Sequence, residues 1–131
     1  MRRALLAILL LHACGDDLAA SADAAASVWP EERIFELPGG GLVEAGLEMA
    51  RGDSVDVEYE SRGGDVTWDL HIHDGDEVRT EAQGRDRAGA FTFVAGEAGT
   101  YWSSWLNDRP SPLEVRVQFS GHGSTEFRGW L

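Results

Sequence analysis

The stretch VTWDLHIHDGDEV, residues 66–78, contains the pattern that repeats along most of this 131-residue chain. Its apolar and polar side chains alternate at a period of two, which is typical of a β-strand with one buried face. The apolar face carries Val66, Trp68, Leu70 and Ile72, and the polar face carries Thr67, Asp69, His71 and His73. The run ends at Asp74-Gly75, a pair that favours a two-residue hairpin turn of type I′. We therefore predict a core-facing strand followed by a hairpin.

The same alternation continues through residues 29–131, and Gly-rich turns separate the runs. Further strands are expected around residues 43–49, 55–59, 91–94, 101–106 and 113–119. No run has the period of an amphipathic helix. About seven or eight short strands with turns at this spacing predict an all-β fold, an antiparallel β-sandwich of the jelly-roll kind. A small closed barrel would give nearly the same pattern, so the sequence leaves that alternative open.

The amino terminus, MRRALLAILLLHACGDD (residues 1–17), has a short cationic start, an apolar run and then the only cysteine of the chain. A membrane span needs about 20 apolar residues, and this run is roughly half as long, as is typical of a secretory signal peptide. Residues 11–14, Leu-His-Ala-Cys, resemble the lipobox of bacterial lipoproteins, with His12 in place of the small or hydroxyl residue usual at that position. We predict a lipoprotein signal peptide over residues 1–13.

The lipobox resemblance implies that Cys14 becomes the first residue of the mature protein and carries a diacylglycerol, with a further acyl chain such as palmitate on its amino group. Several acyl chains anchor a protein firmly, because each buried methylene contributes about 0.8 kcal/mol. Gly15 rather than aspartate follows the cysteine, which by resemblance to enterobacterial sorting favours the outer membrane. The alternative is plain secretion with an unpaired thiol, a liability in an oxidising compartment.

Residues 14–28 are rich in Ala, Ser and Asp and poor in bulky apolar side chains, so we predict a flexible tether ahead of a domain over residues 29–131. Without residues 1–13 the chain carries nine basic and 23 acidic residues, a formal net charge of −14. Such a surface repels phosphate backbones, so nucleic acid is not an expected partner. The expected partners are the membrane, through the lipid anchor, and an envelope protein or a small ligand.

A second resemblance extends from Gly52 to Phe119. Its elements are Gly52-Asp53, Tyr59, Phe91 and Phe93, Gly99 and Tyr101, Trp105, Asn107, and Val115 and Val117. Together they are similar to the pattern of the GOLD (emp24-type) domain and its bacterial relatives. The resemblance implies a compact β-sandwich that binds proteins or ligands without a catalytic apparatus. Because packing residues define that family, it assigns no site residue to this chain.

His71 and His73 are two residues apart on the predicted strand, so both point to one face, with Cβ atoms about 7 Å apart. Two imidazoles at this spacing can bind one Zn²⁺ or Cu²⁺ ion, and Asp69 on the same face is a candidate third ligand. The tertiary structure could also bring His122 beside them. The alternative is an ordinary solvent-facing strand face opposite the core. We expect no cofactor and keep a periplasmic Cu- or Zn-binding protein as the second hypothesis.

The five tryptophans differ in their predicted positions. Trp68 and Trp105 lie on predicted inner faces, and Trp29 and Trp130 lie at the ends of the domain, where they would clamp the termini. Trp102 falls on the outward face of its strand, in an apolar patch or under a loop. Because exposed aromatic side chains often mark binding surfaces, Trp102 is the candidate for a binding surface.

Catalytic motifs are absent from the sequence, which has no G-x-S-x-G elbow, no H-E-x-x-H and no phosphate-binding loop. We therefore expect no enzyme. Dispersed serines and carboxylates leave an envelope hydrolase as a remote alternative. The sequence as a whole predicts a membrane-anchored lipoprotein of the bacterial cell envelope, whose non-catalytic β-sandwich serves as a binding or structural module in the periplasm or on the cell surface.

Overall fold

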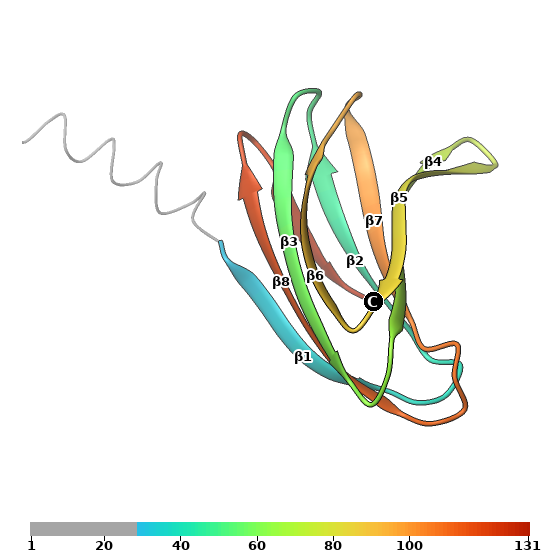
Figure 1. The fold of residues 1–131 in the computed structure, drawn as a ribbon. Helices are drawn as coiled ribbons and strands as arrows, with labels where there is room; N and C mark the ends of the chain where they lie inside the picture. Colours follow the sequence, from blue (N-terminus) through green and yellow to red (C-terminus); the bar gives the residue numbers. More distant parts are fainter. Residues whose placement is uncertain (1–28) are drawn as a thin grey trace, which may run out of the picture.

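The computed structural model describes residues 29–131. The predicted signal peptide (1–13), the predicted acylation site Cys14 and the predicted tether (14–28) lie outside these described residues. Residues 29–131 form nine β-strands in two sheets (Figure 1). The strands are β1 (Glu31–Leu37), β2 (Leu42–Met49), β3 (Ser54–Arg62), β4 (Val66–Asp74), β5 (Glu77–Asp86), β6 (Ala88–Val94), β7 (Gly99–Leu106), β8 (Leu113–His122) and β9 (Glu126–Trp130). The same range contains no helix of the length and hydrophobicity that a membrane span requires.

The strand order is that of a jelly roll. One sheet has the order β1-β8-β3-β6, and the other has the order β5-β4-β7-β2-β9. The pairs β1·β8, β2·β7, β3·β6 and β4·β5 are all antiparallel, as in one long hairpin of eight strands rolled up on itself. β9 is added beside β2 at the sheet edge. The two sheets are separate, so the predicted antiparallel sandwich is confirmed and the closed barrel is not formed.

The core lies between the two sheets, where the alternation in the sequence places it. In β3, Val55, Val57 and Tyr59 are buried, whereas the intervening carboxylates face solvent. Tyr59 packs against Trp105 and Trp68, with ring centroids 5.2 Å and 5.9 Å apart. Burial of each such side chain contributes about 1.5–3 kcal/mol, so this apolar layer is the main stabilising feature of the domain.

The two terminal tryptophans of the domain meet at one aromatic side chain. Trp29 and Trp130 both pack against Phe127, with centroid distances of 6.5 Å and 5.7 Å. Trp130 also contacts Phe35 and Phe119 at 5.8 Å and 5.6 Å. These contacts join the two ends of the domain, as the sequence predicts.

Three details differ from the sequence-based expectation. There are nine strands rather than seven or eight, because the alternation is too short to reveal the edge strands β1 and β9. The hairpin after β4 is present, but Asp74 pairs with Glu77, so the turn residues are Gly75 and Asp76 rather than Asp74 and Gly75. Only Gly75 has a positive φ, of 64°, which is the pattern of a type II′ turn and not of type I′.

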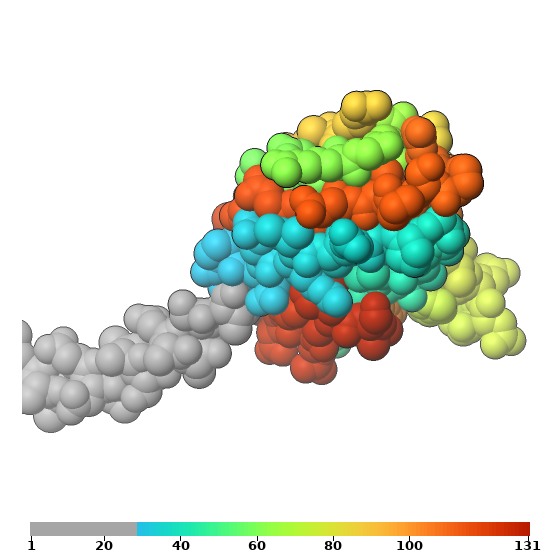
Figure 2. Space-filling view, turned by 90° about the horizontal axis from the view of Figure 1, so that it is seen from below, coloured from blue at the N-terminus to red at the C-terminus, as the bar shows by residue number. Residues whose placement is uncertain are grey.

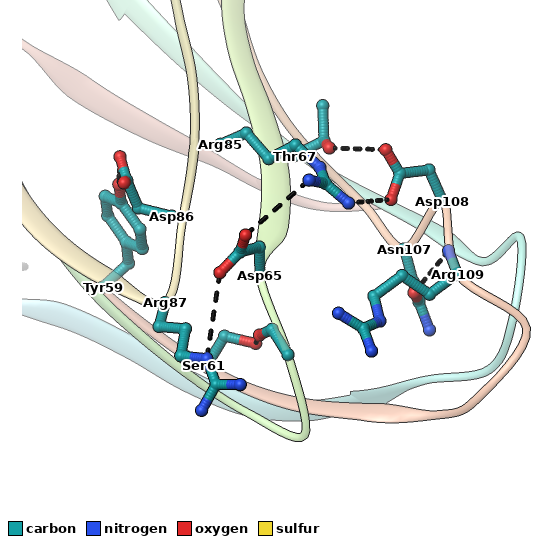
Figure 3. Close-up of polar contacts among 11 residues, drawn as sticks. Tyr59, Ser61, Asp65, Thr67, Arg85, Asp86, Arg87, Asn107, Asp108 and Arg109 are labelled. Carbon is teal, nitrogen blue, oxygen red and sulfur yellow. Dashed lines mark hydrogen bonds and ion pairs between the residues drawn. The ribbon is translucent and has the colours of Figure 1, made fainter.

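Polar contacts fix the loop of residues 107–112 at one end of the sandwich (Figure 3). Asn107 is fully buried, and its Nδ2 donates hydrogen bonds to the carbonyl oxygens of Leu37 (3.0 Å) and Ser111 (2.8 Å). Its Oδ1 accepts a hydrogen bond from the backbone N–H of Arg109 at 3.0 Å. One amide group therefore connects the loop to the end of β1.

The β4–β5 hairpin extends beyond the body of the domain (Figures 1 and 2). Pairing between β4 and β7 ends at Ile72, whereas β4 and β5 stay paired as far as Asp74 and Glu77. The last residues of β4 therefore leave the sheet together with β5. This divergence opens the surface at the start of β7.

Candidate functional site

The side chains that the sequence indicates as site candidates lie on the outer face of the five-stranded sheet. The register places Asp69, Ser104 and Glu44 in one row across β4, β7 and β2, and His71, Trp102 and Gly46 in the next row. Directly opposed residues of antiparallel strands have Cβ atoms about 5 Å apart, so each row forms one contact group.

His71 is held between two carboxylates. Its Nδ1 lies 2.6 Å from Oδ1 of Asp69, and its Nε2 lies 3.8 Å from Oε2 of Glu44. The sequence predicts that His71 faces solvent, but it is only 9% exposed. It does lie on the outer face; neighbouring side chains on β7 and β2, among them Trp102 and Glu44, enclose it there. The outward strand face is therefore partly closed over at this point.

The structure brings together only some of the metal ligands that the sequence suggests. The imidazole rings of His71 and His73 have centroids 5.2 Å apart, and Asp69 contacts His71. His122 lies on the opposite sheet, where its Nε2 is 2.8 Å from Oδ2 of Asp56. Within residues 29–131 no group of three or more His, Cys, Asp and Glu side chains is arranged to hold a metal ion.

The contacts of His122 have an electrostatic consequence on the opposite sheet. Hydrogen bonds from Thr92 and from His122 hold the pKa of Asp56 below its ordinary value. The structure does not bring His122 beside His71 and His73, because β8 and β4 belong to different sheets.

Ser104 and His71 both contact Glu44, but they do not form a Ser-His-Asp relay. The Ser104 hydroxyl donates its hydrogen bond to Oε2 of Glu44 at 2.6 Å, and Ser104 is only 6% exposed. A nucleophile of that kind needs its hydroxyl hydrogen-bonded to the imidazole and accessible to a substrate. This cluster is therefore a polar network that orders side chains of β2, β4 and β7.

The six-membered ring of Trp102 reaches over the neighbouring strand β2 at Gly46. A Cβ atom at position 46 would come within 3.1 Å of Cζ3 and 3.3 Å of Cη2 of this ring, which is closer than an ordinary van der Waals contact. Arg128, in β9, is the next neighbour on the far side of Gly46. Because a glycine has no side chain, the indole can cross β2 on the outer surface of the sheet, where it remains partly exposed.

Further apolar side chains lie on the same outer face, beyond the row of Glu44 and Ser104. Leu42 and Leu106 are opposed in β2 and β7, and Leu131 pairs through its backbone with Glu44. Leu42 is 54% exposed and Leu131 is 73% exposed. We call this surface the Trp102 face and define it by Leu42, Glu44, Glu48, Asp69, Trp102, Leu106 and Leu131. It combines an aromatic ring and leucines with carboxylates, as protein-binding surfaces do.

The carboxylates of the Trp102 face lack basic partners. Among residues 29–131, no arginine forms an ion pair with Glu44, Glu48 or Asp69. Their hydrogen-bond donors are neutral hydroxyl groups or the imidazole of His71. The Ser104 hydroxyl donates to Glu44 at 2.6 Å, and the Thr100 hydroxyl donates to Glu48 at 2.5 Å. These three carboxylates are therefore not neutralised by ion pairs, and Arg128, beside Gly46, pairs with Glu126 instead.

A surface hollow of about 470 Å³ lies beside Trp102, where the β4–β5 hairpin leaves the sheet. Its lining includes His73, Asp74, Glu97, Thr100 and Trp102. Arg79 of β5 forms ion pairs at the rim with Asp74 (3.7 Å) and with Glu97, so the carboxylates here are partly neutralised. The hollow is large enough for one long side chain.

The sequence indicates Trp102 as a candidate but not the residues that surround it on the sheet. The alternation predicts a strand over residues 43–49 but gives Glu44, Gly46 and Glu48 no role beyond it. A glycine inside a strand often marks a close approach of another group, and this signal at Gly46 could have indicated a partner lying across β2.

No family model matches the chain, and no curated protein matches it. Solved structures do match. The Yersinia pseudotuberculosis-derived mitogen has a TM-score of 0.58 at 14% identity, over 78% of this chain and 93% of the mitogen. The periplasmic inhibitor of g-type lysozyme from Aeromonas hydrophila, PliG, has a TM-score of 0.56 at 16% identity, over 71% of this chain and 86% of the inhibitor. PirA has a TM-score of 0.53 at 16% identity, over 68% and 93%. At such identities these likenesses show the fold alone.

Proposed function

We propose that this protein is a lipoprotein of the bacterial cell envelope, anchored through Cys14, whose jelly-roll sandwich binds another envelope protein through the Trp102 face. The role is binding rather than catalysis. The anchor rests on the lipobox-like residues 11–14, and the tether over residues 14–28 would hold the sandwich away from the lipid surface. The GOLD-like pattern between Gly52 and Phe119 agrees with a binding module.

One observation carries the binding role: a partly exposed tryptophan lies across a glycine at the centre of an outer sheet face. Most large aromatic side chains of the domain are buried or pack against the core, as Trp105 does. Trp102 instead covers the outside of the sheet, on the same face as the exposed Leu42. Tryptophan is enriched among the residues that dominate binding energy in protein interfaces, which supports a contact surface here.

The signal-peptide pattern supports an envelope compartment for this protein, and the fold is compatible with it. A sandwich of similar shape serves as the periplasmic lysozyme inhibitor of Aeromonas hydrophila. The proposed role therefore requires no structural element beyond the sandwich that residues 29–131 form. The GOLD resemblance and the lipid anchor are independent parts of the proposal and need separate tests.

Photo-crosslinking in living cells of the producing bacterium tests the binding role. A photoreactive amino acid replaces Leu42 on the Trp102 face or, as the control, Val94 on the four-stranded sheet; the two sites are 54% and 59% exposed. We expect a discrete crosslinked species from position 42 that disappears when Trp102→Ala is added, and none from position 94. Equal products from both positions, or products that Trp102→Ala does not change, would contradict the proposal.

Metabolic labelling with an alkyne fatty acid tests the anchor. We expect the wild-type chain to be labelled and the Cys14→Ser variant to remain unlabelled, because the thiol and the new amino group at residue 14 are the acylated atoms. An unlabelled wild-type chain would refute the lipoprotein assignment and leave the binding role of the Trp102 face standing.

A further inference from the structure

We infer that the partner presents an arginine-rich segment to the Trp102 face, with a guanidinium group over the Trp102 indole and its N–H groups directed to Glu44 and Glu48. This inference rests on the proposed binding function and names the chemistry of its partner. It follows from the charge of the domain, the free acceptor atoms of the two carboxylates, and the shape of the surface beside the ring.

The net charge of the domain indicates that the partner segment is positively charged. Residues 29–131 carry 20 acidic and nine basic residues, a formal net charge of −11. Several of these arginines are committed to ion pairs elsewhere; Arg85 pairs with Asp65 and Asp108, and Arg116 pairs with Glu32. Beside the Trp102 face, Arg128 pairs with Glu126, and Glu44, Glu48 and Asp69 have no arginine partner among the described residues. An anionic segment, or a second copy of this chain, would place like charges together, whereas a cationic segment is attracted before contact.

Free hydrogen-bond acceptors point to guanidinium groups. Glu44 and Glu48 each receive a hydroxyl hydrogen bond at Oε2, from Ser104 and Thr100 respectively. Among residues 29–131 no donor reaches Oε1 of either carboxylate. These hydroxyl bonds hold both carboxylates in place, and each keeps one oxygen open for an incoming N–H. A guanidinium carries five donors in a planar fork, so it can reach such acceptors while it lies on an aromatic ring.

The tryptophan completes the recognition element. A cation above an indole gains about 0.5–2 kcal/mol, and tryptophan is the best aromatic partner for it. Glu44 and Glu48 flank Gly46 in β2, and the six-membered ring of Trp102 lies over that glycine. The ring is therefore placed between the two carboxylates. The hollow of about 470 Å³ beside Trp102 offers room for the aliphatic part of a neighbouring side chain of the same segment.

Fluorescence anisotropy with a labelled hexa-arginine peptide and the purified full chain at about 150 mM salt tests this inference. The site variant is Glu44→Gln/Glu48→Gln, in which each amide oxygen can still accept the hydroxyl hydrogen bond. The control is Glu36→Gln/Glu58→Gln, which removes two exposed charges from the outer face of the four-stranded sheet. Both double variants change the net charge equally. Circular dichroism and urea denaturation establish that every variant compared is folded.

We expect the site variant and Trp102→Ala each to weaken peptide binding by about tenfold, and the control variant to change it by less than about twofold. Equal weakening by both double variants would show general attraction to an acidic protein and overturn the inference. Absence of peptide binding to the wild-type chain would also overturn it. If peptide binding fails in either of these ways but crosslinking from position 42 persists, the arginine-rich partner is excluded and the proposed binding function stands. Failure of this inference can therefore be distinguished from failure of the proposed function.

Discussion

The ring of Trp102 lies against the backbone of Gly46 in the adjacent strand, and a Cβ atom on Gly46 would come within 3.1 Å of Trp102 Cζ3 and 3.3 Å of Cη2. The two residues are opposed in the antiparallel pairing of β2 and β7. Because position 46 has no side chain, the indole can extend over β2 on the solvent side. The position of Trp102, the proposed contact residue, therefore depends on the absence of a side chain at Gly46.

Gly46→Val should displace the indole. The added methyl groups occupy the space of the six-membered ring, and overpacking of this kind costs about 1–3 kcal/mol in the free energy of unfolding. Gly96→Val is the matched control, because a Cβ atom there meets nothing within 4 Å. Urea denaturation should show a loss for Gly46→Val and a change below about 0.5 kcal/mol for Gly96→Val. Equal stability of the two variants would mean that the ring does not rest on Gly46.

Asn107→Ala should destabilise the domain by at least about 2 kcal/mol, because it leaves buried backbone groups without their partner. The amide serves the carbonyl oxygens of Leu37 and Ser111 and the N–H of Arg109. Asn107→Asp should cost at least as much, since an acceptor would then face two carbonyl oxygens. Ser111→Ala is the control, because only the backbone carbonyl of Ser111 takes part. Urea denaturation measures all three, and a neutral Asn107→Ala would contradict the role of this contact.

The strand faces were predictable because burial between two sheets imposes a period of two. Val55, Val57 and Tyr59 are an example, and all three are buried as expected. Edge strands give a weaker signal. β9 has only five residues, of which four pair with β2, and Gly129 has a positive φ of 118° near a register shift. Such a strand is stabilised by its partner and by Trp130 in the core, and neither is visible in a local pattern.

The candidate site was predictable only in part, since it depends on register between distant strands. The outward direction of Trp102 follows from alternation, but its position over Gly46 follows from the pairing of β2 with β7. The same holds for His71. Its strand face was correctly predicted, but its burial depends on Glu44 and Trp102, which come from two other strands.

Stability at acid pH should depend on Asp53, which joins two turns. Its carboxylate accepts hydrogen bonds from the backbone N–H of Ala50 (2.8 Å) and from the backbone and hydroxyl of Ser124 (3.1 Å and 2.8 Å). These bonds, with the one from Ala50 the largest cause, hold the pKa of Asp53 below its ordinary value of 3.8. The lower pKa in the folded state means that the ionised form stabilises the fold above pH 3.8, and this contribution is lost as pH falls through the folded-state pKa.

Asp53→Asn should therefore be less stable than the wild type at pH 7, and the difference should shrink as the pH falls below about 4. Urea denaturation at several pH values measures it. Asp76→Asn, in the exposed hairpin turn, removes the same charge without removing a hydrogen bond among the described residues, so it should match the wild type at pH 7. A difference between Asp53→Asn and the wild type that stays constant down to pH 2 would exclude the carboxylate hydrogen bonds as its origin.

His71→Gln/His73→Gln should leave the affinity for Cu²⁺ and Zn²⁺ unchanged within about threefold. One nitrogen of His71 is engaged by Asp69 at 2.6 Å, and the other faces Glu44 from a position that is only 9% exposed. An ion on His73 would therefore have one accessible imidazole, whereas protein zinc sites use three or four ligands. Isothermal titration with each ion measures the affinity, and His122→Gln corrects for binding to the other exposed imidazole of residues 29–131, which lies beside Asp56. A wild-type affinity at least about tenfold tighter than that of the double variant would establish the metal site and overturn this prediction.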